Sequence, residues 1–149
     1  MNKWTYRGLR IAEEVQSWSK DRTKIGACLM RPNHTIASVG YNGLPPGLDD
    51  DEILKDRALK NTMVMHAEEN AIHNCGDHNM KDYTMFVYGL YPCAHCASVI
   101  VSKGIKRVYG LAVHSSPDWA VSCANALMVF RQAECDFVPV DIYEYKGLK

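Results

Sequence analysis

Two short motifs place metal-ligating side chains at the starts of two predicted helices. Pro92-Cys93-Ala94-His95-Cys96 carries cysteines three positions apart, a spacing that puts both sulfur atoms within reach of one metal ion. His66 opens the preceding helix and supplies a third ligand. The fold must therefore bring the N-termini of these two helices to one point, where unpaired backbone N–H groups also face a ligand.

The donor types indicate zinc, because imidazole and two thiolates favour Zn²⁺ over Mg²⁺ or Ca²⁺, which prefer oxygen ligands. A structural zinc site would need a fourth protein ligand, whereas a catalytic site keeps a position for water. His95 should point away from the metal of the cysteines that flank it. The other candidates lie at or beyond the far end of the helix that His66 opens: His73, Cys75 and His78. We therefore expect one catalytic zinc ion.

Glu68 follows His66 by two positions, close to the metal but free to face a substrate. A water bound to zinc can have a pKa near 7, and one adjacent carboxylate can then move the protons of a hydrolytic reaction in turn. Glu69 is the competing carboxylate, and one step round the helix should turn it elsewhere. His-x-Glu followed by Pro-Cys-x-x-Cys is the signature of zinc deaminases, so Glu68 is predicted to be the catalytic proton shuttle.

Hydrophobic periodicity predicts an α/β fold. The expected elements are, in order, a helix at 5–19, strands at 25–30 and 35–39, a short helix at 53–59, a helix at 67–74, a strand at 85–88, a helix at 93–102, a strand at 108–113, a helix at 119–133 and a strand at 137–143. The first two strands should form a hairpin, and the last three should be parallel because helices connect them. We expect a single domain over 1–149, with three α/β/α layers around a mixed five-stranded sheet.

An acidic run, Asp49-Asp50-Asp51-Glu52, precedes the predicted short helix. Acidic side chains suit the positive end of a helix dipole, so the run is interpreted as a helix start. The alternative is that these carboxylates help to hold a nucleotide-bound Mg²⁺. Both interpretations stay open from the sequence.

Composition limits the possible partners. Lys and Arg together number 17, as do Asp and Glu, so no global field attracts nucleic acid or an anionic membrane. No apolar stretch is long enough to span a bilayer, and residues 1–13 are too charged for the core of a signal peptide, so we expect a cytoplasmic protein. Of six cysteines, Cys28, Cys123 and Cys135 lie in apolar segments and are expected to be buried.

Over residues 19–109 the chain resembles the deoxycytidylate (dCMP) deaminase family of the cytidine-deaminase superfamily. The resemblance rests on Ser19-Lys20-Asp21, Ile25-Gly26-Ala27, Gly40-Tyr41-Asn42-Gly43-Leu44-Pro45, His66-Ala67-Glu68-Glu69-Asn70-Ala71-Ile72, Pro92-Cys93-Ala94-His95-Cys96-Ala97 and Gly104-Ile105-Lys106. It implies a cytidine-deaminase-like fold and hydrolysis of dCMP to dUMP and ammonia, which supplies dUMP for thymidylate synthesis.

Two other substrates are the alternatives. One is a 5-substituted dCMP, carrying a 5-methyl or 5-hydroxymethyl group. The other is a base within a polynucleotide, which would require a basic groove along the phosphate backbone. The neutral composition argues against the polynucleotide, so a small nucleotide is the expected partner, with no nucleic acid and no membrane.

Substrate contacts follow in part from the resemblance. It implies that Asn42 meets the sugar and that the backbone N–H of Ala67 meets the pyrimidine, although Asn42 also suits a turn with left-handed geometry. Tyr91, just before Pro92, is either an aromatic wall of the base pocket or a core residue. The candidates for binding the 5′-phosphate are three basic side chains of one short loop, of which we expect one to act: Lys20, Arg22 and Lys24.

The resemblance also implies regulation and assembly. It implies that dCTP activates and dTTP inhibits at a site around Gly40, Tyr41, Asn42 and Gly43, with Mg²⁺ accompanying the effector, and that the chain forms a homohexamer. Two departures from the family pattern stand out. Residues 114–119 replace a segment rich in aspartate and tyrosine, and Asp21 stands where some phage members use a cysteine for a second, structural zinc.

Overall fold

A mixed five-stranded sheet forms the centre of the computed structural model, which describes all residues 1–149. Its strands run in the order β2-β1-β3-β4-β5, with bounds β1 Gly26–Met30, β2 Ile36–Tyr41, β3 Thr84–Gly89, β4 Arg107–Ala112 and β5 Asp136–Pro139. β1 pairs antiparallel with both β2 and β3, whereas β3, β4 and β5 are parallel. The predicted hairpin and the predicted parallel crossovers are both confirmed.

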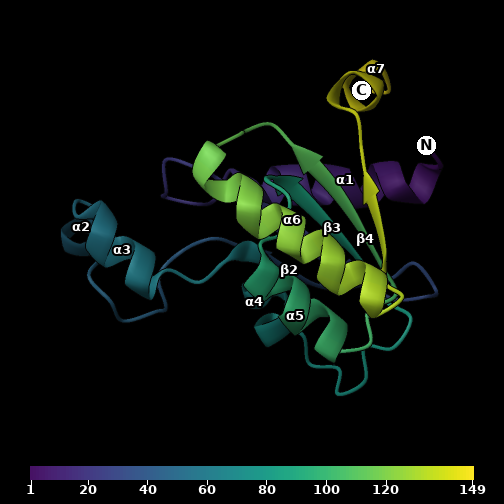
Figure 1. The fold of residues 1–149 in the computed structure, drawn as a ribbon, viewed down its shortest axis with the longest axis horizontal. Helices are drawn as coiled ribbons and strands as arrows, with labels where there is room; N and C mark the ends of the chain where they lie inside the picture. Colours follow the sequence, from purple (N-terminus) through teal and green to yellow (C-terminus); the bar gives the residue numbers. More distant parts are fainter.

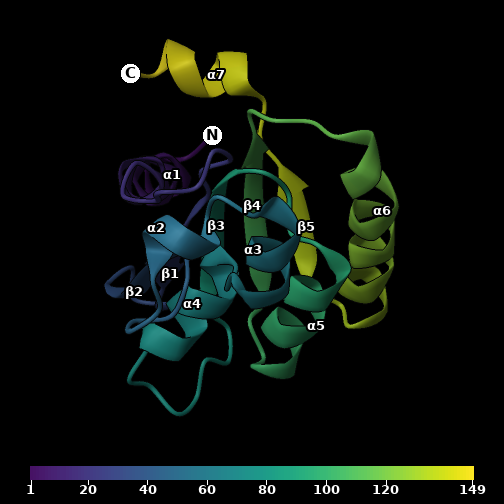
Figure 2. The same cartoon turned by 90° about the vertical axis from the view of Figure 1, so that its left-hand side faces the viewer.

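Helices cover the two faces of the sheet (Figure 2). α1 (Lys3–Gln16) lies on one face, and α4 (Ala67–Asn74), α5 (Ala94–Ser102) and α6 (Pro117–Gln132) lie on the other. The short helices α2 (Asp50–Ile53) and α3 (Arg57–Met63) project from one end of the molecule (Figure 1). The three-layer α/β/α prediction is therefore confirmed.

Every residue of β1 is buried because the strand is central and covered on both faces. Successive side chains point to opposite sides of a strand. Ala27 and Leu29 accordingly join the core beneath α4 and α5, while Cys28 and Met30 join the core beneath α1. Of the other two cysteines expected to be buried, Cys135 is buried and Cys123 is half-buried.

α4 packs unusually close to β2, and a glycine permits this. A Cβ atom on Gly40 would lie 2.3 Å from the backbone nitrogen of Ala71 and 2.5 Å from the carbonyl oxygen of Ala67. Any side chain at this position would force the helix away from the strand. The glycine therefore determines how α4 sits over the edge of the sheet.

The predicted last strand, 137–143, is wrong in its second half. β5 ends at Pro139, and α7 (Ile142–Gly147) follows. Proline has no N–H group to continue a ladder. The Asp141 side chain then accepts hydrogen bonds from the backbone N–H groups of Tyr143 and Glu144, at 2.8 and 3.0 Å, and caps the new helix.

The predicted short helix, 53–59, is also wrong, because the segment forms two helices. The side chain of Asp49 caps α2 by accepting from the N–H of Glu52 at 3.1 Å. Asp56 caps α3 in the same way, by accepting from Leu59 at 3.1 Å. Two capping aspartates in one stretch start two helices, and the capping interpretation of Asp49 agrees with the structure.

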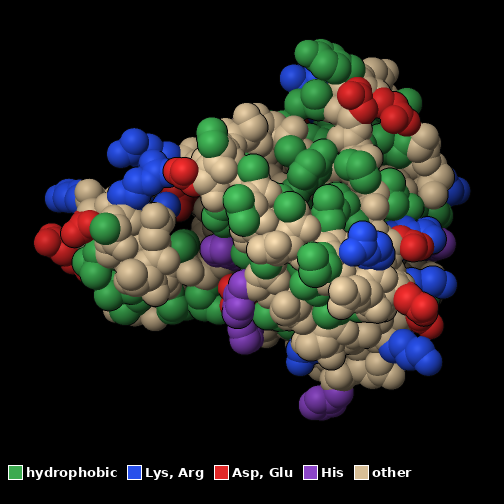
Figure 3. All heavy atoms as spheres, in the orientation of Figure 1, with side chains coloured by type: hydrophobic (Ala, Val, Ile, Leu, Met, Phe, Trp, Pro, Cys, Tyr) green, Lys and Arg blue, Asp and Glu red, His purple; other side chains and the backbone are tan.

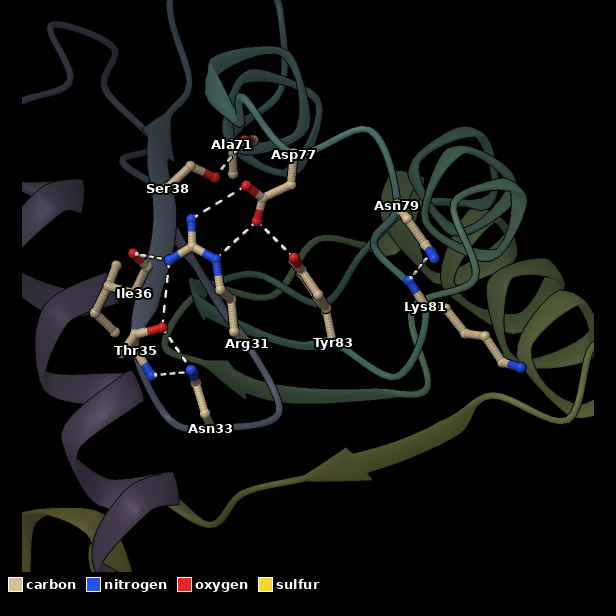
Figure 4. A network of polar contacts seen from close by, with 10 residues as sticks. All are labelled: Arg31, Asn33, Thr35, Ile36, Ser38, Ala71, Asp77, Asn79, Lys81 and Tyr83. Carbon is tan, nitrogen blue, oxygen red and sulfur yellow. Dashed lines mark hydrogen bonds and ion pairs between the residues drawn. The ribbon is translucent and has the colours of Figure 1, made fainter.

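A polar network ties the turn of the β1–β2 hairpin to the loop after α4 (Figure 4). Arg31 donates to the Asp77 carboxylate from Nε at 2.8 Å and from Nη2 at 3.3 Å, and the Tyr83 hydroxyl donates to the same carboxylate. Arg31 also donates to the carbonyl oxygen of Ile36 at 3.0 Å. No helix of the structure combines the length and the apolar composition needed to cross a membrane.

Candidate metal centre and active site

The predicted zinc ligands meet where α4 and α5 begin. His66 is the N-cap residue of α4 and Cys93 is the N-cap residue of α5, while Cys96 lies in the first turn of α5. Nδ1 of His66 is 3.2 Å from Sγ of Cys96 and 3.5 Å from Sγ of Cys93. The ligand atoms of all three residues lie within 4.8 Å of one another, close enough to share one metal ion.

The segments that carry these ligands are held at the same end of the sheet. Met65, just before His66, forms an isolated β-bridge with Gly43, with hydrogen bonds of 2.9 and 3.0 Å in the two directions. Gly89 ends β3 with φ +124°, and its carbonyl oxygen accepts from the N–H of Val113 at 2.9 Å. The loop to Cys93 is therefore anchored to the carboxyl end of β4, where ligands gather in open α/β sheets.

The electrostatics of the donors favour metal binding. A hydrogen bond from the Cys96 side chain lowers the pKa of Cys93 to about 4, although burial opposes the change. The same contact, together with burial, raises the pKa of Cys96. A hydrogen bond to Cys93 raises the pKa of His66. One thiolate thus exists at neutral pH, and a bound cation would favour ionisation of the second.

The donor set fits a catalytic zinc site better than a structural one. The structure groups three ligand side chains and no fourth. Nε2 of His95 lies 3.5 Å from the Glu69 carboxylate, and the His95 side chain is 68% exposed, facing away from the ligands. His73 and Cys75 lie at the other end of α4, about 10 and 14 Å along the helix axis from His66 at about 1.5 Å per helical residue.

Glu68 lies in the first turn of α4 and is only 4% exposed. Burial raises the pKa of its carboxyl group to about 6, while the neighbouring His66 acts in the opposite direction. Such a carboxyl group can both accept and release a proton near neutral pH. Glu69 pairs with His95, in agreement with the expectation that it turns elsewhere, so Glu68 is the carboxyl group beside the candidate ligands.

A cavity of about 490 Å³ opens above His66 and Glu68, within the size range of small-molecule sites. Its walls come from the loop after α1, from the end of β2, from α3, and from the loops after β3 and β4. The residues that line it are Asp21, Thr23, Ile25, Asn42, Arg57, Lys60, Asn61, Val64, His66, Glu68, Leu90, Tyr91, His114, Ser115, Ser116, Asp118 and Trp119.

Two of the predicted substrate contacts lie in this lining. The Asn42 side chain is buried, accepts from the N–H of Ile25 at 2.9 Å and donates to the carbonyl oxygen of Thr23 at 2.7 Å. Its amide keeps a further donor and acceptor position. Tyr91 lines the cavity and also packs edge-on against Phe137, with ring centroids 5.3 Å apart. Ala67 is buried at the first position of α4, where a backbone N–H has no partner within the helix.

None of the three basic residues predicted for the phosphate lines the large cavity. Lys20 pairs with Asp50 at 2.8 Å, and Lys24 donates to the carbonyl oxygen of Ser19. Lys20 and Arg22 line a smaller cavity, of about 60 Å³, beside the large one. The loop lysines are thus largely engaged with their own surroundings.

The cavity contains two basic residues that sequence reasoning missed, Arg57 and Lys60. They lie three positions apart on α3, and this spacing on one face of a helix was the available signal. The single helix predicted for 53–59 hid it, because Lys60 fell outside that helix. Asp21 pairs with Lys60 at 2.8 Å.

The residues predicted to surround an effector lie mainly at the end of β2. Gly40 and Tyr41 close that strand, and the Tyr41 side chain is 40% exposed and packs edge-on against Trp18. Gly43 forms the bridge to Met65. Residues 114–119, the segment that departs from the family pattern, contribute Trp119, whose indole N–H donates to the carbonyl oxygen of Tyr91 at 3.2 Å.

The three ligand side chains and the buried carboxyl group beside them are the features expected of an enzyme that uses a metal ion. The family model described as the cytidine and deoxycytidylate deaminase zinc-binding region matches residues 2–112. The chain belongs to this deaminase family.

Individual relatives agree with this placement. A protein of Aliivibrio fischeri described as an uncharacterized deaminase is 35% identical over 149 residues, which cover 95% of this chain and 98% of that protein. A deoxycytidylate deaminase of Pongo abelii is 40% identical over 113 residues, which cover 71% of this chain and 63% of that protein. The apo structure of the dCMP deaminase of cyanophage S-TIM5 superimposes with a TM-score of 0.72 at 23% identity, covers 94% of this chain and 100% of that chain, and shows the shared fold.

Proposed function

We propose that this protein hydrolyses dCMP to dUMP and ammonia and so supplies dUMP for thymidylate synthesis. One observation carries the proposal: a buried carboxyl group, Glu68, lies beside three zinc donors at the base of a cavity of about 490 Å³. The family supports a cytosine-type substrate. The relative that shares 40% of aligned residues is named for deoxycytidylate, which favours the nucleotide over the free base.

Glu68 performs the proton transfers in this proposal. Zinc held by His66, Cys93 and Cys96 would supply a water ligand of lowered pKa and a positive charge beside the reacting carbon. Glu68 takes a proton from the attacking water and delivers it to N3 of the cytosine ring as the C4–O bond forms. It then moves the remaining hydroxyl proton to the amino group, so that the C4–N bond breaks and ammonia leaves. One water is consumed, and the carboxylate is regenerated.

The surrounding residues would orient the nucleotide. Asn42 is held rigidly by two backbone groups and keeps hydrogen-bonding capacity for the sugar. The backbone N–H of Ala67 would meet a pyrimidine acceptor at the start of α4. Tyr91 offers the base an aromatic wall that Phe137 supports from behind.

Ammonia release tests the proposal directly. The zinc-loaded protein should act on dCMP with a kcat/KM far above that for single-stranded DNA. Parallel assays with 5-methyl-dCMP, 5-hydroxymethyl-dCMP and deoxycytidine define the tolerance at the cytosine 5-position and at the phosphate. Activity confined to a 5-substituted dCMP or to the polynucleotide would replace the proposed substrate, and activity on none of them would refute the reaction.

Regulation and assembly are proposals of the same kind. dCTP as activator and dTTP as inhibitor, with Mg²⁺, would act around Gly40, Tyr41, Asn42 and Gly43, and kinetics at subsaturating dCMP with each effector would detect them. The proposed assembly is a homohexamer. Self-association is supported by apolar side chains exposed on α6: Val121 is 71% exposed, Leu127 50% and Met128 49%. Sedimentation analysis would measure the mass of the assembly.

A further inference from the structure

A small basic cavity adjoins the active-site cavity. It measures about 60 Å³, and its lining includes four basic side chains, Lys20, Arg22, Arg57 and Lys60, with Asp21 as the one acidic group. Arg57, Lys60 and Asp21 also line the large cavity, so the two spaces share a wall. Figure 3 shows Lys and Arg side chains gathered where the α2–α3 projection meets the main body of the protein. A ligand that fills the large cavity can therefore extend an anionic group toward this wall.

The four basic residues differ in how far their charges are already compensated. Lys60 pairs with Asp21 at 2.8 Å, and both side chains are largely buried, at 14% and 8% exposure. Lys20 is turned outward to Asp50. Arg57 and Arg22 have no carboxylate partner among the ion pairs of the structure. Of these two, Arg57 alone lines both cavities.

The Lys60–Asp21 pair has a separate consequence for Arg57. It ties α3 to the loop after α1 and so holds the helix over the cavity, one turn from Arg57. The acidic residue closest in sequence, Asp56, is occupied in capping α3. The guanidinium group is therefore carried by an anchored helix without a competing internal anion.

We propose that Arg57 binds the 5′-phosphate of the substrate and makes the enzyme select a mononucleotide over the nucleoside, an inference that rests on the proposed cytosine deamination. A planar guanidinium can donate two parallel hydrogen bonds to phosphate oxygens, which fixes orientation as well as charge. The sugar and base then extend past Asn42 toward Glu68. Of the residues expected from the loop after α1, Arg22 is placed to assist from the smaller cavity.

Arg57→Gln tests this role in the zinc-loaded protein, with Lys55→Gln as the matched control. Lys55 is exposed, lies two positions away, and lines neither cavity, so its substitution removes the same charge from the same projection. In Arg57→Gln we expect kcat/KM for dCMP to fall about 10- to 100-fold, mainly through KM, as the loss of charge-assisted hydrogen bonds predicts. The value for deoxycytidine should change less than about twofold, and Arg57→Lys should restore part of the loss.

The outcomes separate this inference from the proposed function. If the wild-type protein deaminates neither dCMP nor deoxycytidine, the proposed function fails before Arg57 is considered. If the wild type acts on dCMP, three results overturn the role of Arg57: equal losses on dCMP and deoxycytidine, no loss on either, or an equal loss in Lys55→Gln. A loss confined to dCMP in Arg57→Gln, with an unchanged melting temperature, supports it.

Discussion

Two polar clusters lie at opposite ends of α4. At its amino end, His66 and Glu68 join the cysteines of α5. Beyond its carboxyl end, Asp77 joins Arg31 and Tyr83 (Figure 4). The clusters differ in what their charges face. Arg31 and Asp77 neutralise each other, whereas Glu68 is buried and forms no ion pair with a lysine or an arginine.

This difference separates structure from chemistry. A carboxylate matched to a guanidinium is stabilised in its charged form, and the Arg31 contact lowers the pKa of Asp77. A carboxyl group held in a buried pocket has its pKa raised, as for Glu68, and can exchange a proton near neutral pH. A carboxyl group thus fastens the fold beyond one end of α4, whereas the carboxyl group at the other end has a pKa suited to proton transfer.

The largest expected effect is at the amino end of α4. Glu68→Gln keeps the shape of the side chain but removes its ability to carry protons, so turnover of dCMP should fall by roughly 10²- to 10⁴-fold. Zinc content, measured by metal analysis, and melting temperature should stay at wild-type values. Glu69→Gln is the control on the same helix, because Glu69 faces His95 and should retain most of the activity. Comparable losses of turnover in the two variants would contradict the assignment of the proton transfers to Glu68 alone.

Gly40→Ala should affect both clusters, because α4 connects them. The added Cβ would lie 2.3 Å from the backbone of Ala71, so α4 must move. We expect the free energy of unfolding to fall by about 1–3 kcal/mol, as for overpacked cores, with weaker zinc binding because His66 moves with the helix. Urea denaturation and zinc titration measure the two effects. Unchanged stability would mean that α4 can move away from β2 at little cost in free energy.

In the cluster beyond the carboxyl end of α4, Asp77→Asn should lower the stability of the protein without altering the rate of deamination. The variant loses the ionic part of the contact with Arg31 but keeps a side chain of similar size. The midpoint of urea denaturation should decrease, while kcat for dCMP stays within about twofold of wild type because no residue of the cluster lines the cavity. A large loss of kcat in the folded variant would show that the two clusters are coupled.

The smallest effect is the acid dependence of this same pair. The pKa of Asp77 is lower in the folded protein than its ordinary value of 3.8, so its contribution is complete above that value and is lost as the pH falls through the folded pKa. Wild type should therefore lose stability faster than Asp77→Asn as the pH drops below about 4. Denaturation midpoints at several acidic pH values compare the slopes. Parallel slopes would show that other carboxyl groups account for the acid sensitivity.

The sequence predicted most of the layer architecture because each core element carries its own periodicity. The predicted helix at 67–74 has the bounds of α4, and the strands predicted at 25–30 and 85–88 correspond to β1 and β3. Errors arose where a local hydrogen bond decides the outcome. The caps made by Asp56 and Asp141 start α3 and α7 in segments whose hydrophobic pattern predicts other structures.

The sequence alone was enough to predict which donor side chains come together. The pattern of His66, Glu68, Cys93 and Cys96 depends on spacing along two helix starts, which local geometry preserves. Which basic side chains face the cavity depends on the three-dimensional fold. Lys20 and Lys24 look available in the sequence but lie against Asp50 and the Ser19 carbonyl, while Arg57 faces the site. Long charged side chains take their partners from whatever the fold brings near, and sequence spacing does not record those neighbours.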